Sequence, residues 1–93
     1  MIQYNMIDNE TEFAAQYEDI KDRFSKNLPD VVKDVHRVGH VHMIVASIDD
    51  HMIDIAYRTN QTSVIIYGEG SEKIKNKLEE RLNITLNPME ASN

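Results

Sequence analysis

Three apolar runs in the middle of the chain, separated by only a few polar residues, constrain the fold more than any other feature. The runs are HVHMIVASI, MIDIAYRT and SVIIYG, and the segments DDH and NQT lie between them. Segments this short are typical of hairpin turns that join neighbouring strands. The sequence therefore predicts an antiparallel meander at the centre of a sheet.

The residues before the meander predict one more strand and a first helix. Ile2, Tyr4 and Met6 alternate with polar residues, as in a short strand. A helix is expected from about Thr11 to Lys26, because apolar residues then recur at helical spacing. The members of this stripe are Phe13, Tyr17, Ile20 and Phe24.

Two further helices are expected, one before the meander and one after it. Pro29 can open a short second helix, which Gly39 would stop. Its buried side would consist of Val31, Val32 and Val35. Ser71 can cap a final helix, which Asn87 and Pro88 would end. The buried stripe of that helix would consist of Ile74, Leu78 and Leu82.

Together these elements predict one domain, residues 1–93, with an α+β fold. The expected architecture is a three- to four-stranded antiparallel meander sheet with helices packed on one face. In the middle strand, one set of residues would face the helices: Ile53, Ile55 and Tyr57. The other set would face away: Met52, Asp54, Ala56 and Arg58. The strands on either side are apolar on both faces, so we expect a second copy of the chain to cover the second face, as a homodimer.

The charge balance limits the possible partners. Sixteen acidic residues against ten basic residues give a net charge of −6. Direct nucleic-acid binding needs a basic surface, so we expect a basic protein partner instead. An acidic balance also aids solubility without any further role. The chain has no cysteine, no run long enough to span a membrane and no signal-peptide pattern, so a cytoplasmic protein without membrane association is expected.

Acidic residues concentrate in the first third of the chain, where residues 8–34 hold eight acids and four bases. The eight acids are Asp8, Glu10, Glu12, Glu18, Asp19, Asp22, Asp30 and Asp34. Carboxylates three to seven residues apart on a helix lie about 5 to 10 Å apart, which is one to three phosphate steps along a DNA strand. A row of this kind can occupy a cleft built for DNA, and the alternative is an ordinary solvated helix face.

Three histidines lie close together in VHRVGHVHM and are the weak candidates for a metal site: His36, His40 and His42. On a strand, His40 and His42 would project from the same face. A durable site also needs partners that fix the imidazole tautomers, and the sequence shows none. We therefore expect no metal and no cofactor.

No segment of the chain carries a complete catalytic motif. Asp49 and Asp50 would share one watery turn rather than the two environments that acid–base chemistry needs. The segment IIYGEGSEK has the order strand, Gly-x-Gly, helix, but Lys73 stands where a dinucleotide fold needs a third glycine. A tight turn is the expected structure there, and the sequence predicts a protein that is not an enzyme.

The chain resembles a family of small acidic phage proteins, the Arn-like anti-restriction proteins, which imitate DNA. The resemblance is carried by the length, the lack of cysteine and the acidic run DNETEFAAQYEDIKD. It implies a non-enzymatic homodimeric inhibitor that occupies the DNA-binding surface of a host restriction nuclease or nucleoid protein in the host cytoplasm. The alternative is a regulatory or antitoxin-like module that binds protein through an apolar sheet face.

Overall fold

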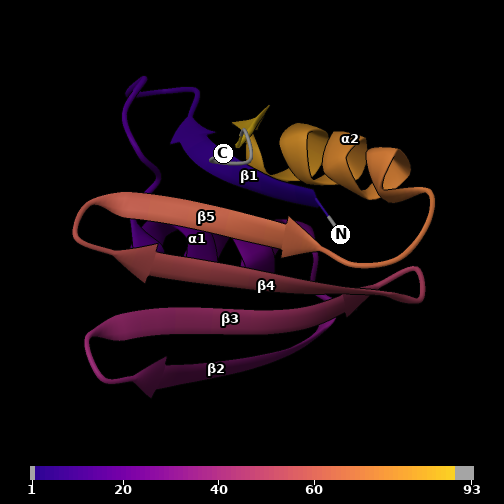
Figure 1. The fold of residues 1–93 in the computed structure, drawn as a ribbon, viewed down its shortest axis with the longest axis horizontal. Coiled ribbons are helices and arrows are strands. Elements are labelled where there is room, and N and C mark those ends of the chain that lie inside the picture. The colour runs from indigo at the N-terminus through magenta and orange to yellow at the C-terminus, as the bar shows by residue number, and fades with distance from the viewer. Residues whose placement is uncertain (1, 90–93) are drawn as a thin grey trace.

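The computed structural model describes residues 2–89, which form a six-stranded sheet and two helices (Figure 1). The strands are β1 (Ile2–Asp8), β2 (Val32–Val38), β3 (Val41–Ile48), β4 (His51–Arg58), β5 (Gln61–Ile66) and β6 (Ile84–Pro88). The helices are α1 (Tyr17–Asn27) and α2 (Ser71–Leu82). The strand order is β2-β3-β4-β5-β1-β6, and each neighbouring pair is antiparallel. The predicted α+β class is confirmed.

The central meander forms as the short polar segments predict. Asp49 and Asp50 join β3 to β4, and Thr59 and Asn60 join β4 to β5. All four residues have positive φ, between 43° and 66°. Two successive residues of this kind give a turn whose twist matches that of the strands. Asp and Asn tolerate the conformation better than most residues do, which explains why the connections are polar and short.

The expected count of three to four strands is wrong, and β2 is the first strand that was missed. It occupies the segment expected as a short helix after Pro29. Val38 pairs with Val41 across a two-residue turn in which Gly39 has a φ of 61°. The segment is rich in valine, and β-branched residues favour strands over helices. That preference, together with a hairpin partner, outweighs the helix-opening tendency of the proline.

The second missed strand, β6, begins where α2 ends. The helix ends at Leu82 rather than at Asn87 and Pro88, because Asn83 takes a left-handed conformation with a φ of 53°. The chain then turns back and β6 pairs with β1, with Leu86 opposite Met6. Strand β1 therefore lies between β5 and β6 rather than at an edge.

Helix α1 begins at Tyr17 and not at Thr11, because residues 9–16 form a loop. An isolated bridge pairs Ile7 with Ala14, and Glu12 has a φ of 66°. Phe13 is 76% exposed, so it does not belong to the buried stripe of the helix. The rest of the predicted stripe is confirmed and consists of Tyr17, Ile20 and Phe24.

Both helices contribute to one core on one face of the sheet, the inner face. Figure 1 views the sheet from the opposite side, with α1 behind the strands. The buried strand residues of this core are Tyr4, Met6, Ile44, Ala46, Ile48, Ile53, Ile55, Val64, Ile66, Ile84 and Leu86. Their alternation along each strand leaves the other set of side chains on the outer face. Among the described residues no helix covers that outer face.

Candidate partner-binding surface

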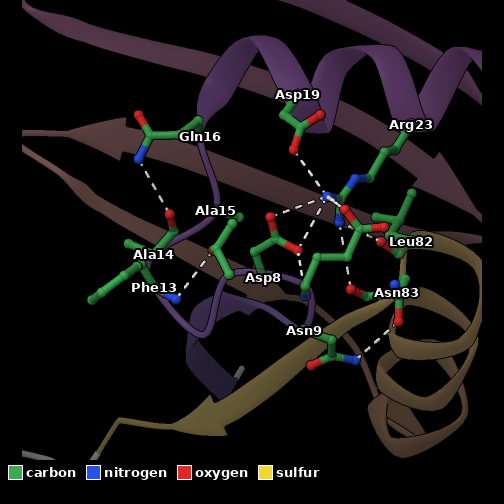
Figure 2. Close-up of polar contacts among 12 residues, drawn as sticks. Asp8, Asn9, Phe13, Ala14, Ala15, Gln16, Asp19, Arg23, Leu82 and Asn83 are labelled. Carbon is green, nitrogen blue, oxygen red and sulfur yellow. Dashed lines mark hydrogen bonds and ion pairs between the residues drawn. The ribbon is translucent and has the colours of Figure 1, made fainter.

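The guanidinium of Arg23 gathers three of the eight acidic residues that the sequence assigns to a partner-binding surface (Figure 2). Its Nη2 donates to both carboxylate oxygens of Asp8 at 3.1 Å and to Oδ2 of Asp19 at 2.9 Å. Oε2 of Glu10 lies 3.8 Å from the same nitrogen. Nη1 donates to the carbonyl of Leu82 at 2.9 Å, where the C-terminal end of α2 favours a cation. The cluster therefore joins β1, α1 and α2.

This environment stabilises the charge of Arg23 and removes Asp8 from the surface. Burial acts to lower the pKa of Arg23, but the hydrogen bond with Asp8 and the negative charges of Asp19, Asp8 and Glu10 outweigh it and raise the pKa above its ordinary value. The Asp8 side chain is 6% exposed and also accepts the Glu10 backbone N–H at 3.0 Å. The expectation that Asp8 faces a partner is therefore corrected, because its carboxylate binds within the fold.

Four of the predicted acids are open to solvent along α1 and in the loop before it, and of these only Glu10 has its carboxylate within 4 Å of the Arg23 guanidinium: Glu10, Glu12, Glu18 and Asp22. The side chain of Glu18 is 79% exposed and that of Asp22 is 58% exposed. Both extend from the side of α1 that lies away from the core. The two residues are four apart, so they lie about one helical turn, or ~6 Å, from each other along the helix.

Basic residues on α1 accompany these exposed acids. Nζ of Lys21 lies 3.1 Å from Oε2 of Glu18, and Nζ of Lys26 lies 3.0 Å from Oδ2 of Asp22. With Arg23, they give α1 as many bases as acids, so the net negative charge of residues 8–34 comes from the segments on either side of the helix. Exposed pairs of this type contribute little to stability and exchange readily with other charged groups.

The two remaining predicted acids lie elsewhere. Asp30 is exposed in the loop between α1 and β2, at the opposite end of α1 from Glu10. Asp34 is 82% exposed on the outer face of β2, across from Val45, whereas α1 covers the inner face. The eight acids that the sequence assigns to partner binding therefore do not form one continuous surface.

The three clustered histidines lie in three different environments. Nδ1 of His36 is 3.6 Å from the carboxylate of Asp34 on β2. His40 is exposed in the turn between β2 and β3, so it does not share a strand face with His42. The ring of His42 packs against the ring of Tyr17 on α1, with the two centroids 4.6 Å apart and the ring planes tilted by 32°. Among residues 2–89, no group of three or more His, Cys, Asp or Glu side chains is arranged to hold a metal ion.

The segments considered for catalysis have structural roles. Asp49 lies in the β3–β4 turn, where its carboxylate accepts a hydrogen bond from Lys77 at 3.1 Å. The Gly-x-Gly segment forms the expected tight turn, with positive φ at Gly68 and Gly70 before α2 begins at Ser71.

The outer face of strands β2 to β5 carries a mostly apolar surface, which we call the outer apolar face. Two of its residues are strongly exposed, Val38 at 58% and Met52 at 49%. Its other apolar members are half-buried only by their neighbours in the sheet: Val41, Met43, Val45, Ala56, Ile65 and Tyr67. The sequence indicated this surface through the strands that are apolar on both faces.

Two charged residues of β4 lie within the outer apolar face. Asp54 is half-buried and accepts a hydrogen bond from the hydroxyl of Tyr67 at 2.8 Å. This hydrogen bond, together with burial and the negative charge of Asp54, raises the pKa of Tyr67. Arg58 is exposed, and within residues 2–89 no ion pair joins it to an acid.

Comparison with known proteins gives no assignment, since no family model, no curated protein and no solved structure matches the chain. None of the described helices is long and apolar enough to cross a membrane. Any assignment of function therefore depends on the two surfaces described above.

Proposed function

We propose that the chain is a non-enzymatic inhibitor that imitates DNA and occupies the DNA-binding surface of a basic host protein, such as a restriction nuclease or a nucleoid protein. The observation that supports this proposal is the pair of exposed carboxylates of Glu18 and Asp22, one turn apart on α1. Glu10 and Glu12 add exposed negative charge from the loop that leads into the helix.

The spacing and the exposure of these acids suit the role. A separation of ~6 Å along the helix is close to two phosphate steps of a DNA strand. Lys21 and Lys26 pair with these acids only at the surface. A partner's lysine and arginine side chains replace such pairs at low cost and gain complementary contacts.

The second candidate is a regulatory or antitoxin-like module that binds another protein through the outer apolar face. The exposure of Val38 and Met52 favours it, because water-exposed apolar side chains gathered on one face are typical of an interaction surface. The two candidates use opposite sides of the molecule, so mutations separate them.

The test is a competition assay with purified restriction nucleases and nucleoid proteins. Each is bound to a fluorescent DNA duplex, and displacement of the duplex by the chain is followed by anisotropy at several salt concentrations. One variant removes three exposed acids: Glu12→Gln, Glu18→Gln and Asp22→Asn. The matched control removes three exposed acids on and beside α2: Glu69→Gln, Glu72→Gln and Glu80→Gln.

We expect the parent to displace DNA from at least one of these proteins, and less effectively as salt rises, because salt screens exposed charges. The first variant should need about ten-fold more protein for the same displacement, and the control variant should behave like the parent to within about three-fold. Equal displacement by the parent and the first variant would contradict the proposal. The outer apolar face would then be the leading candidate.

A further inference from the structure

We propose that the outer apolar face binds a second copy of this chain, face to face, with the two β4 strands antiparallel across the interface. In this arrangement Asp54 of each protomer meets Arg58 of the other. The inference goes beyond the proposed function and does not depend on it, since it concerns the opposite face of the sheet from α1.

The argument begins with the charges on β4. Asp54 and Arg58 are the two charged residues that this strand presents on the outer face, and Ala56 lies midway between them. A strand rises about 3.3 Å per residue, so each charge lies ~7 Å from Ala56, in opposite directions. If a second copy of β4 lies antiparallel over the first, with Ala56 over Ala56, Asp54 of each strand therefore lies over Arg58 of the other.

A two-fold axis produces this antiparallel arrangement. In a face-to-face pair, an axis that crosses the strands at Ala56 places each β4 over the other in the opposite direction. Two identical ion pairs between Asp54 and Arg58 then form, one on each side of the axis. The small side chain of Ala56 lets the two sheets approach to the usual ~10 Å. Met43 lies opposite Ala56 in the ladder, so it would meet its own copy.

Each member of the proposed pair lacks a charged partner within the described chain. Asp54 is bound by the neutral hydroxyl of Tyr67, and its neighbours in the ladder are Val45 and Ile65. A carboxylate between apolar residues favours a cation above it once water is excluded. Arg58 can supply that cation without breaking an existing ion pair.

The area of the face sets the expected strength. Four strands spaced ~4.8 Å apart and about 20 Å long cover roughly 400 Å² on each protomer, or ~800 Å² in the pair. Apolar surfaces of this size also occur on monomers, so the charge pattern rather than the area identifies the occupant. Interfaces below about 1,200 Å² are commonly weak, so we expect a dimer with a micromolar dissociation constant.

The test is sedimentation equilibrium from about 1 µM to 1 mM, a range that covers weak and moderate dimers. Three variants are compared with the parent: Arg58→Asp, Asp54→Arg and the double exchange of both. Arg58 is exposed, so Arg58→Asp should keep the fold, which circular dichroism checks. Each single variant should raise the dissociation constant at least ten-fold, because it faces like charges twice. The double exchange should return it to within about three-fold of the parent.

A control variant, Val35→Lys, tests whether two copies pair edge to edge through β2 rather than face to face through the outer apolar face. Val35 lies opposite Ile44 and so belongs to the inner face. This variant should dimerise like the parent. A parent that stays monomeric throughout the range, single variants that dimerise like the parent, or a double exchange that fails to restore dimerisation would each overturn the proposal. Loss of the dimer in Val35→Lys alone would do so too, since it would show that copies pair through the β2 edge.

Discussion

The two faces of the sheet differ in what covers them, although the same strands build both. On β4, Ile53 and Ile55 are fully buried under the helices, whereas Met52 and Arg58 on the other face remain exposed. The inner face therefore gains its stabilisation within one chain. The outer face is apolar enough to bind, and it gains comparable burial only when another molecule covers it.

Charged groups follow the same division. On the helix side, Arg23 is bound by carboxylates and by a helix C-terminus, and no buried side-chain polar atom of the described residues lacks a partner. On the outer face, Asp54 has only the Tyr67 hydroxyl and Arg58 has no ion pair within residues 2–89. The first arrangement is typical of a completed interior, and the second is typical of a surface that awaits a partner.

The largest expected effect comes from shortening one isoleucine on each face. Ile53→Ala should lower the free energy of unfolding by about 4 kcal/mol, because it leaves a cavity in the packed core. Ile65→Ala, on the neighbouring strand but on the outer face, should cost about 1 kcal/mol at low protein concentration. Urea unfolding measures both. Equal losses would show that the two faces are packed alike.

The next effect concerns the ionic link between the sheet and the helices. Arg23→Met should cost about 3 kcal/mol, because it leaves the buried carboxylate of Asp8 without its cation. Adding Asp8→Asn should recover part of this loss, since the uncompensated charge is then gone. A double variant less stable than the single one would contradict this account of the cluster.

A smaller effect is expected from pH on the outer face. Because the pKa of Tyr67 is raised in the folded chain, its contribution is fully present below its ordinary pKa of 10.0 and is lost as pH rises through the higher folded value. Unfolding measured between about pH 9 and pH 11 should lose less stability in Tyr67→Phe than in the parent. Near neutral pH that variant should cost only about 0.5 kcal/mol, since the hydrogen bond is partly exposed.

The smallest effect is expected from the exposed acids near α1. The variant with Glu12→Gln, Glu18→Gln and Asp22→Asn should unfold within about 0.5 kcal/mol of the parent, because exposed charges contribute little to stability. A thermal melt measures this directly. A large loss would assign these residues to the fold, and their effect in the competition assay would then need a folded control.

Much of the local structure was accessible from the sequence for identifiable reasons. The alternation in β3, β4 and β5 and the spacing of Ile74, Leu78 and Leu82 follow from the geometry of one strand or one helix. The predictions that were wrong concern segments in which two local signals favour different structures. Pro29 favours a helix start, but the valines after it form β2. Thr11 resembles a cap, but the helix begins at Tyr17.

The candidate surface was predictable only as a set of exposed acids, not as a geometry. Glu18 and Asp22 share a helix face, as their spacing indicates. Asp8 continues the alternation of Tyr4 and Met6 and so shares their buried face, but its cation, Arg23, lies fifteen residues away and no local pattern indicates that pairing. Similarly, nothing in the sequence near Asp34 shows that its strand is at the far edge of the sheet.

The sequence by itself determined the meander, the two amphipathic helices and the acidic balance, because each is set by neighbouring residues or by composition. Only the tertiary structure decided that β1 lies between β5 and β6, that Arg23 joins three elements, and that the hydroxyl of Tyr67 donates to Asp54 on the neighbouring strand. These features bring together residues far apart in the chain. Such contacts form only where the gain from burial outweighs the entropy of closing long loops, which no local pattern records.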